Sequence, residues 1–133
     1  MIRHSLLFGG EAYSLIGTSV IGRVHYGCPL EECSKNGFWR SPDIALWDNK
    51  RYVGKHHAKI TLDRNSNCWI EDLRSRNGTA ILRSPSPIRG ERSPYYFERL
   101  LVGKEYKLFS GDIVTLAYNY RRGPYMMLTY NVA

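Results

Sequence analysis

Two arginines and a serine stand directly before an asparagine-glycine pair in the stretch EDLRSRNGTAIL, residues 71–82. An Asn-Gly pair between two alternating apolar runs predicts a tight hairpin turn. Arg74, Ser75 and Arg76 add two cations and a hydroxyl group to that turn, and Asp72 is expected to accept hydrogen bonds within it. Because such donors bind phosphate or carboxylate oxygens, the pattern indicates an anion-binding site as well as a turn.

Further cations occur in two other segments that contain turn residues. Arg23 follows Gly22 after an apolar run, and Lys55 stands beside His56 in the fragment VGKHHAKI. A phosphomonoester carries nearly two negative charges and three acceptor oxygens, so it needs several donors that converge on it. Loops at one end of a rigid framework can supply them. We therefore expect these turns to lie together in the fold.

The remaining reactive side chains form no catalytic set. Paired carboxylates, a nucleophile elbow and a P-loop are all missing from the sequence, which predicts a binding protein rather than an enzyme. His25, Cys28 and Cys33 have the spacing H-x2-C-x4-C, but structural zinc takes four ligands and no fourth stands nearby. We therefore expect no metal site and no other cofactor. Cys68, beside Trp69 in an apolar run, is expected in the core.

The composition narrows the class of partner. The chain has 133 residues, which fits one domain, and its 19 Lys and Arg against 12 Asp and Glu give a formal charge of +7. This charge favours nucleic acid, phosphorylated protein or an acidic membrane surface. No apolar run is long enough to span a bilayer, and the N-terminal patch is interrupted by glycines, so we expect no membrane partner. Three cysteines, a low and odd number, predict reduced thiols and an intracellular location.

The groups that could bind an anion are expected to be positioned by β-strands. Short apolar or alternating stretches recur along the chain with turn residues between them, and no amphipathic helix is evident. This pattern predicts an all-β fold, a β-sandwich of two antiparallel-rich sheets. The predicted strands are Ser5–Phe8, Ala12–Ile16, Thr18–Ile21, Asp43–Leu46, His57–Asp63, Cys68–Leu73, Thr79–Leu82, Tyr106–Leu108, Asp112–Ala117 and Tyr125–Val132.

Two long segments interrupt the predicted strands. Residues 24–41 are irregular, and residues 83–96 are rich in Ser, Pro and Arg. Loops of this length are uncommon in compact domains unless they are functional or mobile. We interpret both segments as insertions into a single domain that spans residues 1–133.

Four fragments, taken in order, resemble the forkhead-associated (FHA) domain. They are GR at residues 22–23, VGKHHAKI at 53–60, EDLRSRNGT at 71–79 and LFSGDIVTL at 108–116. The family pattern runs G-R, then S-R-x-H, then D-x-x-S-x-N-G-T, then G-D before a late strand. No single fragment is specific, but their combination over nearly the whole chain is. The resemblance implies a β-sandwich that binds a phosphothreonine-containing protein.

The resemblance also implies roles for individual residues. It makes Arg23 and Lys55 contacts of the phosphate, with Ser75 and Arg76 as further phosphate-binding candidates on the loop before Asn77. Asn77 corresponds to the asparagine that hydrogen-bonds the backbone of the bound peptide. The implied structural supports are Gly22, His57 and Gly78.

One residue departs from the family pattern. Gly54 stands where the family has a serine whose hydroxyl donates to the phosphate. Since a hydrogen bond to a charged group contributes about 1.5–3 kcal/mol, its loss could weaken binding by about ten-fold or more. Ser75, Lys55, Arg76 or a water molecule could compensate for the lost donor. The alternatives are an FHA-like interaction module that has lost phosphate binding, and a basic domain that binds nucleic acid directly.

The resemblance extends to the biological setting. Many FHA domains are modules of larger nuclear or signalling proteins. We therefore expect a nuclear location, a role in signalling, and a parent protein in which this chain is one domain.

Overall fold

The computed structural model describes residues 2–24, 42–83, 96–118 and 121–133. In these ranges the chain forms strands and no helix, so none of the described segments is a helix that could cross a membrane. The strands are β1 (His4–Phe8), β2 (Glu11–Ser14), β3 (Thr18–Arg23), β4 (Ile44–Leu46), β5 (Ala58–Leu62), β6 (Cys68–Asp72), β7 (Thr79–Arg83), β8 (Tyr96–Arg99), β9 (Glu105–Leu108), β10 (Ile113–Leu116) and β11 (Met126–Val132).

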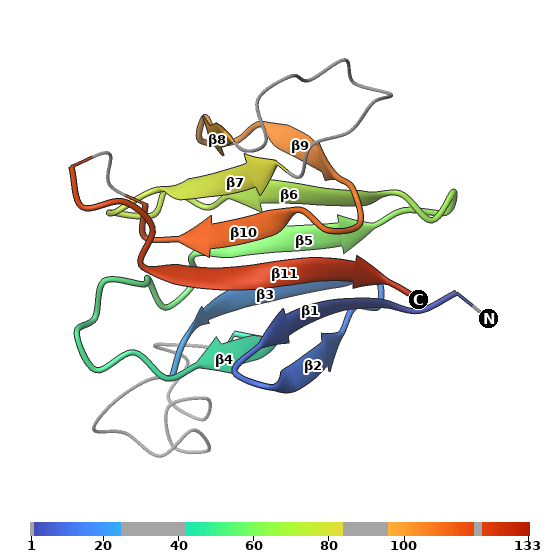
Figure 1. Cartoon of the computed structure of the whole chain (residues 1–133), viewed down its shortest axis with the longest axis horizontal. Coiled ribbons are helices and arrows are strands. Elements are labelled where there is room, and N and C mark those ends of the chain that lie inside the picture. The colour runs from blue at the N-terminus through green and yellow to red at the C-terminus, as the bar shows by residue number, and fades with distance from the viewer. Residues whose placement is uncertain (1, 25–41, 84–95, 119–120) are drawn as a thin grey trace, which may run out of the picture.

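The strands form two sheets that pack face to face (Figure 1). One sheet has the order β2-β1-β11-β10-β7-β8, and the other has the order β4-β3-β5-β6-β9. Neighbouring strands run antiparallel except β3 and β4, which are parallel. The predicted all-β sandwich of two antiparallel-rich sheets is therefore confirmed.

The alternation of side chains along each strand decides which face is buried. In β6, Cys68, Ile70 and Asp72 are buried, whereas the two residues between them are half-buried. Cys68 lies in the core as predicted, and burial raises the pKa of its thiol to about 11. Among the described residues, the largest fully buried aliphatic side chains are Leu6, Ile21, Leu46, Ile60, Ile70, Ile81, Leu116 and Leu128. Full burial of one such side chain stabilises the fold by about 1.5–3 kcal/mol, so the sheets form a rigid base for the loops.

All ten predicted strands occur, and their ends differ from the prediction by a residue or two. One further strand, β8, has no counterpart among the predicted strands. It is a short edge strand that carries the charged pair Glu98-Arg99, so it shows little apolar alternation. It forms because it pairs with β7, and because Glu98 binds Arg83 on that strand.

The outermost residues of both predicted insertions take part in strand pairing, so each insertion is shorter than predicted. Arg83 and Tyr96, the outermost residues of the second insertion, pair with each other across β7 and β8. Val24 donates its backbone N–H to the carbonyl oxygen of Leu46 at 2.8 Å, which continues the pairing of β3 with β4. The rest of both segments, residues 25–41 and 84–95, lies outside the described residues.

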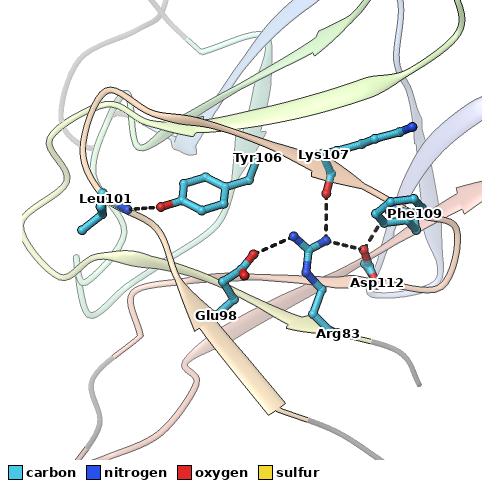
Figure 2. Close-up of polar contacts among 7 residues, drawn as sticks. All are labelled: Arg83, Glu98, Leu101, Tyr106, Lys107, Phe109 and Asp112. Atoms are coloured by element: carbon cyan, nitrogen blue, oxygen red, sulfur yellow. Dashed lines mark hydrogen bonds and ion pairs between the residues drawn. The ribbon is translucent and has the colours of Figure 1, made fainter. Parts of the chain in front are cut away.

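Arg83 connects the two sheets (Figure 2). Its Nη1 donates at 2.8 Å to the carbonyl oxygen of Lys107 in β9 and at 2.8 Å to Oδ2 of Asp112. Its Nη2 donates at 2.6 Å to Oε1 of Glu98 in β8. Asp112 is fully buried and also accepts the N–H of Phe109. The aspartate of the G-D pair in the sequence pattern is therefore the buried counter-charge of Arg83.

Candidate functional site

The turns that carry the predicted anion ligands lie together at one end of the sandwich. β3 and β6 end there and β5 begins there, because β5 pairs antiparallel with both. β7 of the other sheet also begins there, since only the turn of residues 73–78 separates it from β6. The loop between β10 and β11 reaches the same end, since β10 ends opposite the start of β7. Both chain termini lie at the other end of the molecule (Figure 1). Loops far apart in the sequence thus meet on one rigid base.

Gly22 brings the end of β3 against the loop that precedes β5. A Cβ atom built on Gly22 would lie 1.9 Å from the carbonyl oxygen of Lys55, so a larger residue would force the backbone apart. The N–H of Arg23 donates to the carbonyl oxygen of Gly54 at 3.0 Å. The backbones of Arg23 and Lys55 are therefore adjacent, and both side chains are half-buried.

His57 ties this loop to the turn between β6 and β7. Its imidazole is fully buried, Nδ1 accepts the N–H of Gly54 at 2.9 Å, and Nε2 lies 2.8 Å from the carbonyl oxygen of Gly78. Because Nδ1 accepts and Nε2 faces an acceptor, the neutral tautomer with hydrogen on Nε2 fits both contacts. Burial lowers the pKa of His57, although the Gly78 carbonyl and the carboxylates of Asp72 and Asp48 oppose this effect.

Asp72 organises the turn that the sequence analysis singled out. Its Oδ2 accepts the N–H of Ser75 at 3.1 Å, and its Oδ1 accepts the hydroxyls of Ser75 and of Thr79, the latter at 2.6 Å. The prediction that Asp72 accepts hydrogen bonds within the turn is confirmed. The hydroxyl hydrogen of Ser75 is therefore engaged, so the phosphate contact predicted for Ser75 would require this hydrogen bond to break. Gly78 follows with a φ of 85°, a conformation that favours glycine.

Asn77 and Arg76 occupy the tip of the same turn. The side-chain amide of Asn77 donates through Nδ2 to the carbonyl oxygen of Tyr52 at 2.8 Å. This bond joins the turn to the loop between β4 and β5, so the same two loops are linked twice, here and through His57. Asn77 is half-buried and Arg76 is exposed.

Asp48 shapes the loop between β4 and β5. Its carboxylate accepts the N–H of Val53 at 2.7 Å, the N–H of Lys50 at 3.1 Å and the hydroxyl of Tyr125. Burial raises the pKa of Asp48, but the hydrogen bonds from Tyr125 and the backbone outweigh it and hold the pKa below its ordinary value. The sequence analysis missed this residue, because the pair Asp48-Asn49 predicts only a turn and Tyr125 is 77 residues away along the chain.

A pocket of about 210 Å³ opens beside Asn77. The guanidinium carbon of Arg122 lies 4.7 Å from the ring centroid of Tyr52. The Tyr52 ring in turn packs edge-on against Tyr125, with the two centroids 5.0 Å apart. Apart from Asn77, the sequence analysis named none of these residues as site residues, since no family motif covers them. The lining residues include Lys50, Tyr52, Asn77, Arg122, Pro124 and Tyr125.

Gly54, the departure from the family pattern, is not required by the backbone. It does not have a positive φ. A Cβ atom built there would make its closest contact, 3.6 Å, with Nδ1 of His57, which is an ordinary van der Waals distance. A serine at this position would therefore fit.

The arrangement can bind an anion. Arg23, Lys55 and Arg76 reach the same end of the sandwich from three different loops. Asp48, in the loop between β4 and β5, and Asp72, at the end of β6, are buried and accept hydrogen bonds from the loops around them. The surface formed by these loops therefore presents cations, while the acidic groups serve to shape the loops.

The described residues contain no group of three or more His, Cys, Asp or Glu side chains placed to hold a metal ion. His25, Cys28 and Cys33, the residues with zinc-like spacing, lie outside the described residues. The expectation of a protein without metal therefore stays a prediction. Elemental analysis that finds one zinc per purified chain would contradict it.

Comparisons with known proteins agree with this architecture. A family model described as FHA domain matches residues 20–117, well over half of the chain. No curated protein matches the sequence.

Several solved structures share the fold. Full-length yeast Pml1p is 19% identical, with a TM-score of 0.65 and coverage of 100% of this chain and 82% of that one. A second structure describes yeast Pml1 as a splicing factor integrated into the RES complex. The FHA domain of an Arabidopsis thaliana hypothetical protein is 23% identical, with a TM-score of 0.57 and coverage of 98% and 83%. Mycobacterium tuberculosis EmbR, in complex with a low-affinity phosphopeptide, is 23% identical, with a TM-score of 0.58 and coverage of 98% and 24%.

Proposed function

Because this chain belongs to the FHA domain family, we propose that it binds phosphothreonine-containing segments of a partner protein. The FHA domain is an interaction module known for phosphopeptide binding, and one solved relative, EmbR, is in complex with a phosphopeptide. One observation carries the proposal for this chain. His57 joins the loops of Gly54 and Gly78, so the cations beside them are presented from a single rigid end.

The chemistry of the site suits a phosphate better than a single carboxylate. A phosphate ester has three acceptor oxygens and nearly two charges, which can use a guanidinium and an ammonium group together. Arg23 and Lys55 are half-buried, so salt screens their charges less than it screens fully exposed ones. With one N–H of its amide donated to Tyr52, Asn77 has a second N–H and a carbonyl oxygen for the backbone of a bound peptide.

A second candidate function is a protein-interaction module that does not require phosphate. Two observations favour it. Gly54 lacks the hydroxyl of the family serine, and the hydroxyl of Ser75 donates to Asp72. Without these two hydroxyl groups, the predicted phosphate contacts that remain are the cations Arg23, Lys55 and Arg76.

A peptide titration separates these functions. We expect a phosphothreonine peptide, chosen from an oriented library, to bind while its unphosphorylated twin does not. Arg23→Ala should remove this binding with little change in melting temperature, because a partly exposed arginine contributes little to stability. Arg64→Ala is the matched control, since Arg64 is an exposed cation in the turn between β5 and β6 at the other end of the sandwich.

Two other results would change the assignment. Equal affinity for the phosphorylated and unphosphorylated peptides would establish the phosphate-independent module instead. Binding of oligonucleotides that weakens steeply with added salt, without phosphopeptide binding, would identify a nucleic-acid-binding domain.

We also propose that the domain acts in the nucleus, in signalling, as part of a larger protein. The description of yeast Pml1 as a splicing factor supports the nuclear location. Imaging of the tagged full-length protein in cells tests it, and exclusion from the nucleus would contradict it.

A further inference from the structure

The six-stranded sheet has an apolar outer face, on the side away from the core. Leu6 in β1, Val114 in β10 and Ile81 in β7 point into the core, so the residues next to them along each strand point outward. The strand register aligns these outward residues in one row that crosses the whole sheet. Each residue of the row is exposed or half-buried, and none is charged. The row consists of Ala12, Leu7, Thr129, Ile113, Leu82 and Phe97.

A second outward row lies beside the first. Met127, Thr115, Ala80 and Arg99 are paired in register across β11, β10, β7 and β8. Arg99, on the edge strand β8, is the single charged residue of the two rows. Met127 is 47% exposed, and Leu7 of the first row is 38% exposed. These two rows together are called the outer face below, and an extended apolar surface of this kind indicates an interaction site.

The five-stranded sheet presents a different surface on its own outward side. Lys59 in β5 and Glu71 in β6 alternate with core residues and form an ion pair there, with N and O 3.4 Å apart. Glu105 and Lys107 follow on β9. Such charged residues are expected where one face of an antiparallel sheet meets water. Because both sheets have the same pleat, the apolar outer face reflects the residues placed on it rather than the fold.

We propose that the outer face binds the same face of a second copy of this chain, in a two-fold symmetric dimer. Each copy carries a formal charge of +7, so two copies repel each other over most of their surfaces. The outer face brings only Arg99 from each copy into the contact. A two-fold axis that runs along the strands between β10 and β11 places β8 of one copy over β2 of the other. The two Arg99 side chains then lie at opposite edges of the interface.

The area of the outer face fits a reversible dimer. With six strands about 4.8 Å apart and roughly 17 Å of each strand in contact, the face covers roughly 500 Å² per copy. Two copies then bury about 1,000 Å² in total, which is close to the lower limit for a specific interface. We therefore expect a dimer that forms at micromolar or higher concentration, not a permanent one.

Analytical ultracentrifugation of the purified chain, from micromolar to near-millimolar concentration, tests the proposal. The mass should rise with concentration from that of one chain to that of two. A mass of one chain at every concentration would overturn the dimer and would leave the outer face to a different protein. A mass that rises beyond two chains would also overturn it, because two copies joined through one shared face form a closed pair.

The variants assign the dimer to the outer face. Leu7→Glu and Met127→Glu each bury a carboxylate in the apolar interface, so each should weaken dimerisation at least about ten-fold. Ile16→Glu is the matched control, because Ile16 is 82% exposed and lies in the connection between β2 and β3. It should keep the dimer. Melting temperatures are compared to confirm that each variant is folded.

A second variant guards against a loss of folding in the glutamate variants. Leu7→Thr combined with Met127→Thr removes apolar surface but keeps a residue that favours strands. It should weaken dimerisation at least about three-fold, because two exposed apolar side chains are truncated. A dimer that persists in the folded glutamate variants and in this double variant would place the contact elsewhere and overturn the proposal. Equal weakening in Ile16→Glu would reduce the effect to net charge and also overturn it.

The dimer and the proposed phosphothreonine binding are independent of each other. None of the outward residues is among the predicted phosphate or peptide contacts. Leu7→Glu and Met127→Glu should therefore keep the affinity of the unmodified protein for a phosphothreonine peptide, measured at concentrations where all three are monomeric. Failure of the unmodified protein to bind such peptides would contradict the proposed function and leave the dimer standing.

Discussion

Gly22 and Gly54 lie at the same contact between β3 and the loop before β5, but only Gly22 has to be glycine. A side chain on Gly22 would collide with the carbonyl group of Lys55, whereas a side chain on Gly54 would touch only His57 at ordinary distances. The glycine at position 22 therefore maintains the site, and the glycine at position 54 removes a donor from it.

Gly54→Ser should restore the missing donor. We expect tighter phosphothreonine binding by up to about 1–2 kcal/mol, less than a full charge-assisted hydrogen bond because water already serves the phosphate. The melting temperature should be unchanged or slightly raised, since φ at this position is not positive and serine restricts the unfolded chain more than glycine does.

Gly54→Ala is the matched control, because it restricts the backbone without adding a hydroxyl. Calorimetric titration of the three proteins with one phosphopeptide gives the comparison. A gain in Gly54→Ser that Gly54→Ala reproduces would show that the hydroxyl does not reach the phosphate.

At the scale of loops and strands, His57 connects two loops that the sequence separates by about twenty residues. Its imidazole accepts from the N–H of Gly54 and donates to the carbonyl oxygen of Gly78, and its backbone N–H donates to the carbonyl oxygen of Ile21 in β3. A single buried side chain thus sets the distance between the predicted phosphate ligands of the two loops.

His57→Ala should destabilise the fold and weaken peptide binding together. The truncation leaves a cavity and takes the acceptor away from the half-buried N–H of Gly54, which costs about 2–4 kcal/mol in the free energy of unfolding. Urea denaturation measures this loss. His56→Ala, at the exposed neighbouring position, should change stability by less than about 0.5 kcal/mol. Lost binding with unchanged stability in His57→Ala would instead indicate a direct ligand contact.

The Arg83 cluster supports the sandwich away from the candidate site. Arg83→Ala leaves the fully buried Asp112 without its counter-charge, so we expect a loss of about 3–5 kcal/mol in the free energy of unfolding. Glu98→Gln should cost much less, because Glu98 is more exposed and the amide oxygen can still accept from Arg83. At temperatures where both variants are folded, phosphopeptide affinity should match that of the unmodified protein. Reduced affinity in folded Arg83→Ala would show that the two ends of the sandwich are coupled.

The strands were predictable where alternation was strong, as in Cys68–Asp72, and not where pairing alone decided, as in Tyr96–Arg99. The candidate site shows the same contrast between features that local sequence predicts and features that depend on distant segments. The turn of Asp72 and the position of Gly22 follow from local motifs. The contacts of Asp48 with Tyr125 and of Asn77 with Tyr52 join distant segments, and no local pattern encodes them. Long-range hydrogen bonds therefore account for what the sequence analysis missed.

At the scale of the whole molecule, the end with the candidate site exposes cations and buries two of its carboxylates. The formal charge is +7, and the loops of the candidate site expose Lys50, Arg51, Arg74, Arg76 and Arg122. The carboxylates of the same loops, Asp48 and Asp72, are buried. An approaching polyanionic segment therefore meets a positive end of the molecule, which should speed association at low salt.

The buried histidine at this end gives the whole fold a defined dependence on pH. Burial lowers the pKa of His57 in the folded state, so near pH 6.5, the ordinary histidine value, the unfolded chain takes up a proton that the folded protein does not. Since protons bind more to the unfolded state, stability falls as the pH drops below about 6.5, with a slope of up to about 1.4 kcal/mol per pH unit. The loss should stop once the pH falls below the pKa of His57 in the folded state.

Urea denaturation at a series of pH values between about 7.5 and about 5 measures this slope, and His57→Ala should reduce it. Asp48 does not interfere in this window, because its lowered pKa gives stability that is present above the ordinary aspartate value of about 4 and is lost only at more acidic pH. His56→Ala should keep the slope of the unmodified protein. An equal slope in His57→Ala and in the unmodified protein would show that another group binds the proton, and that His57 can be charged without opening the two loops it joins.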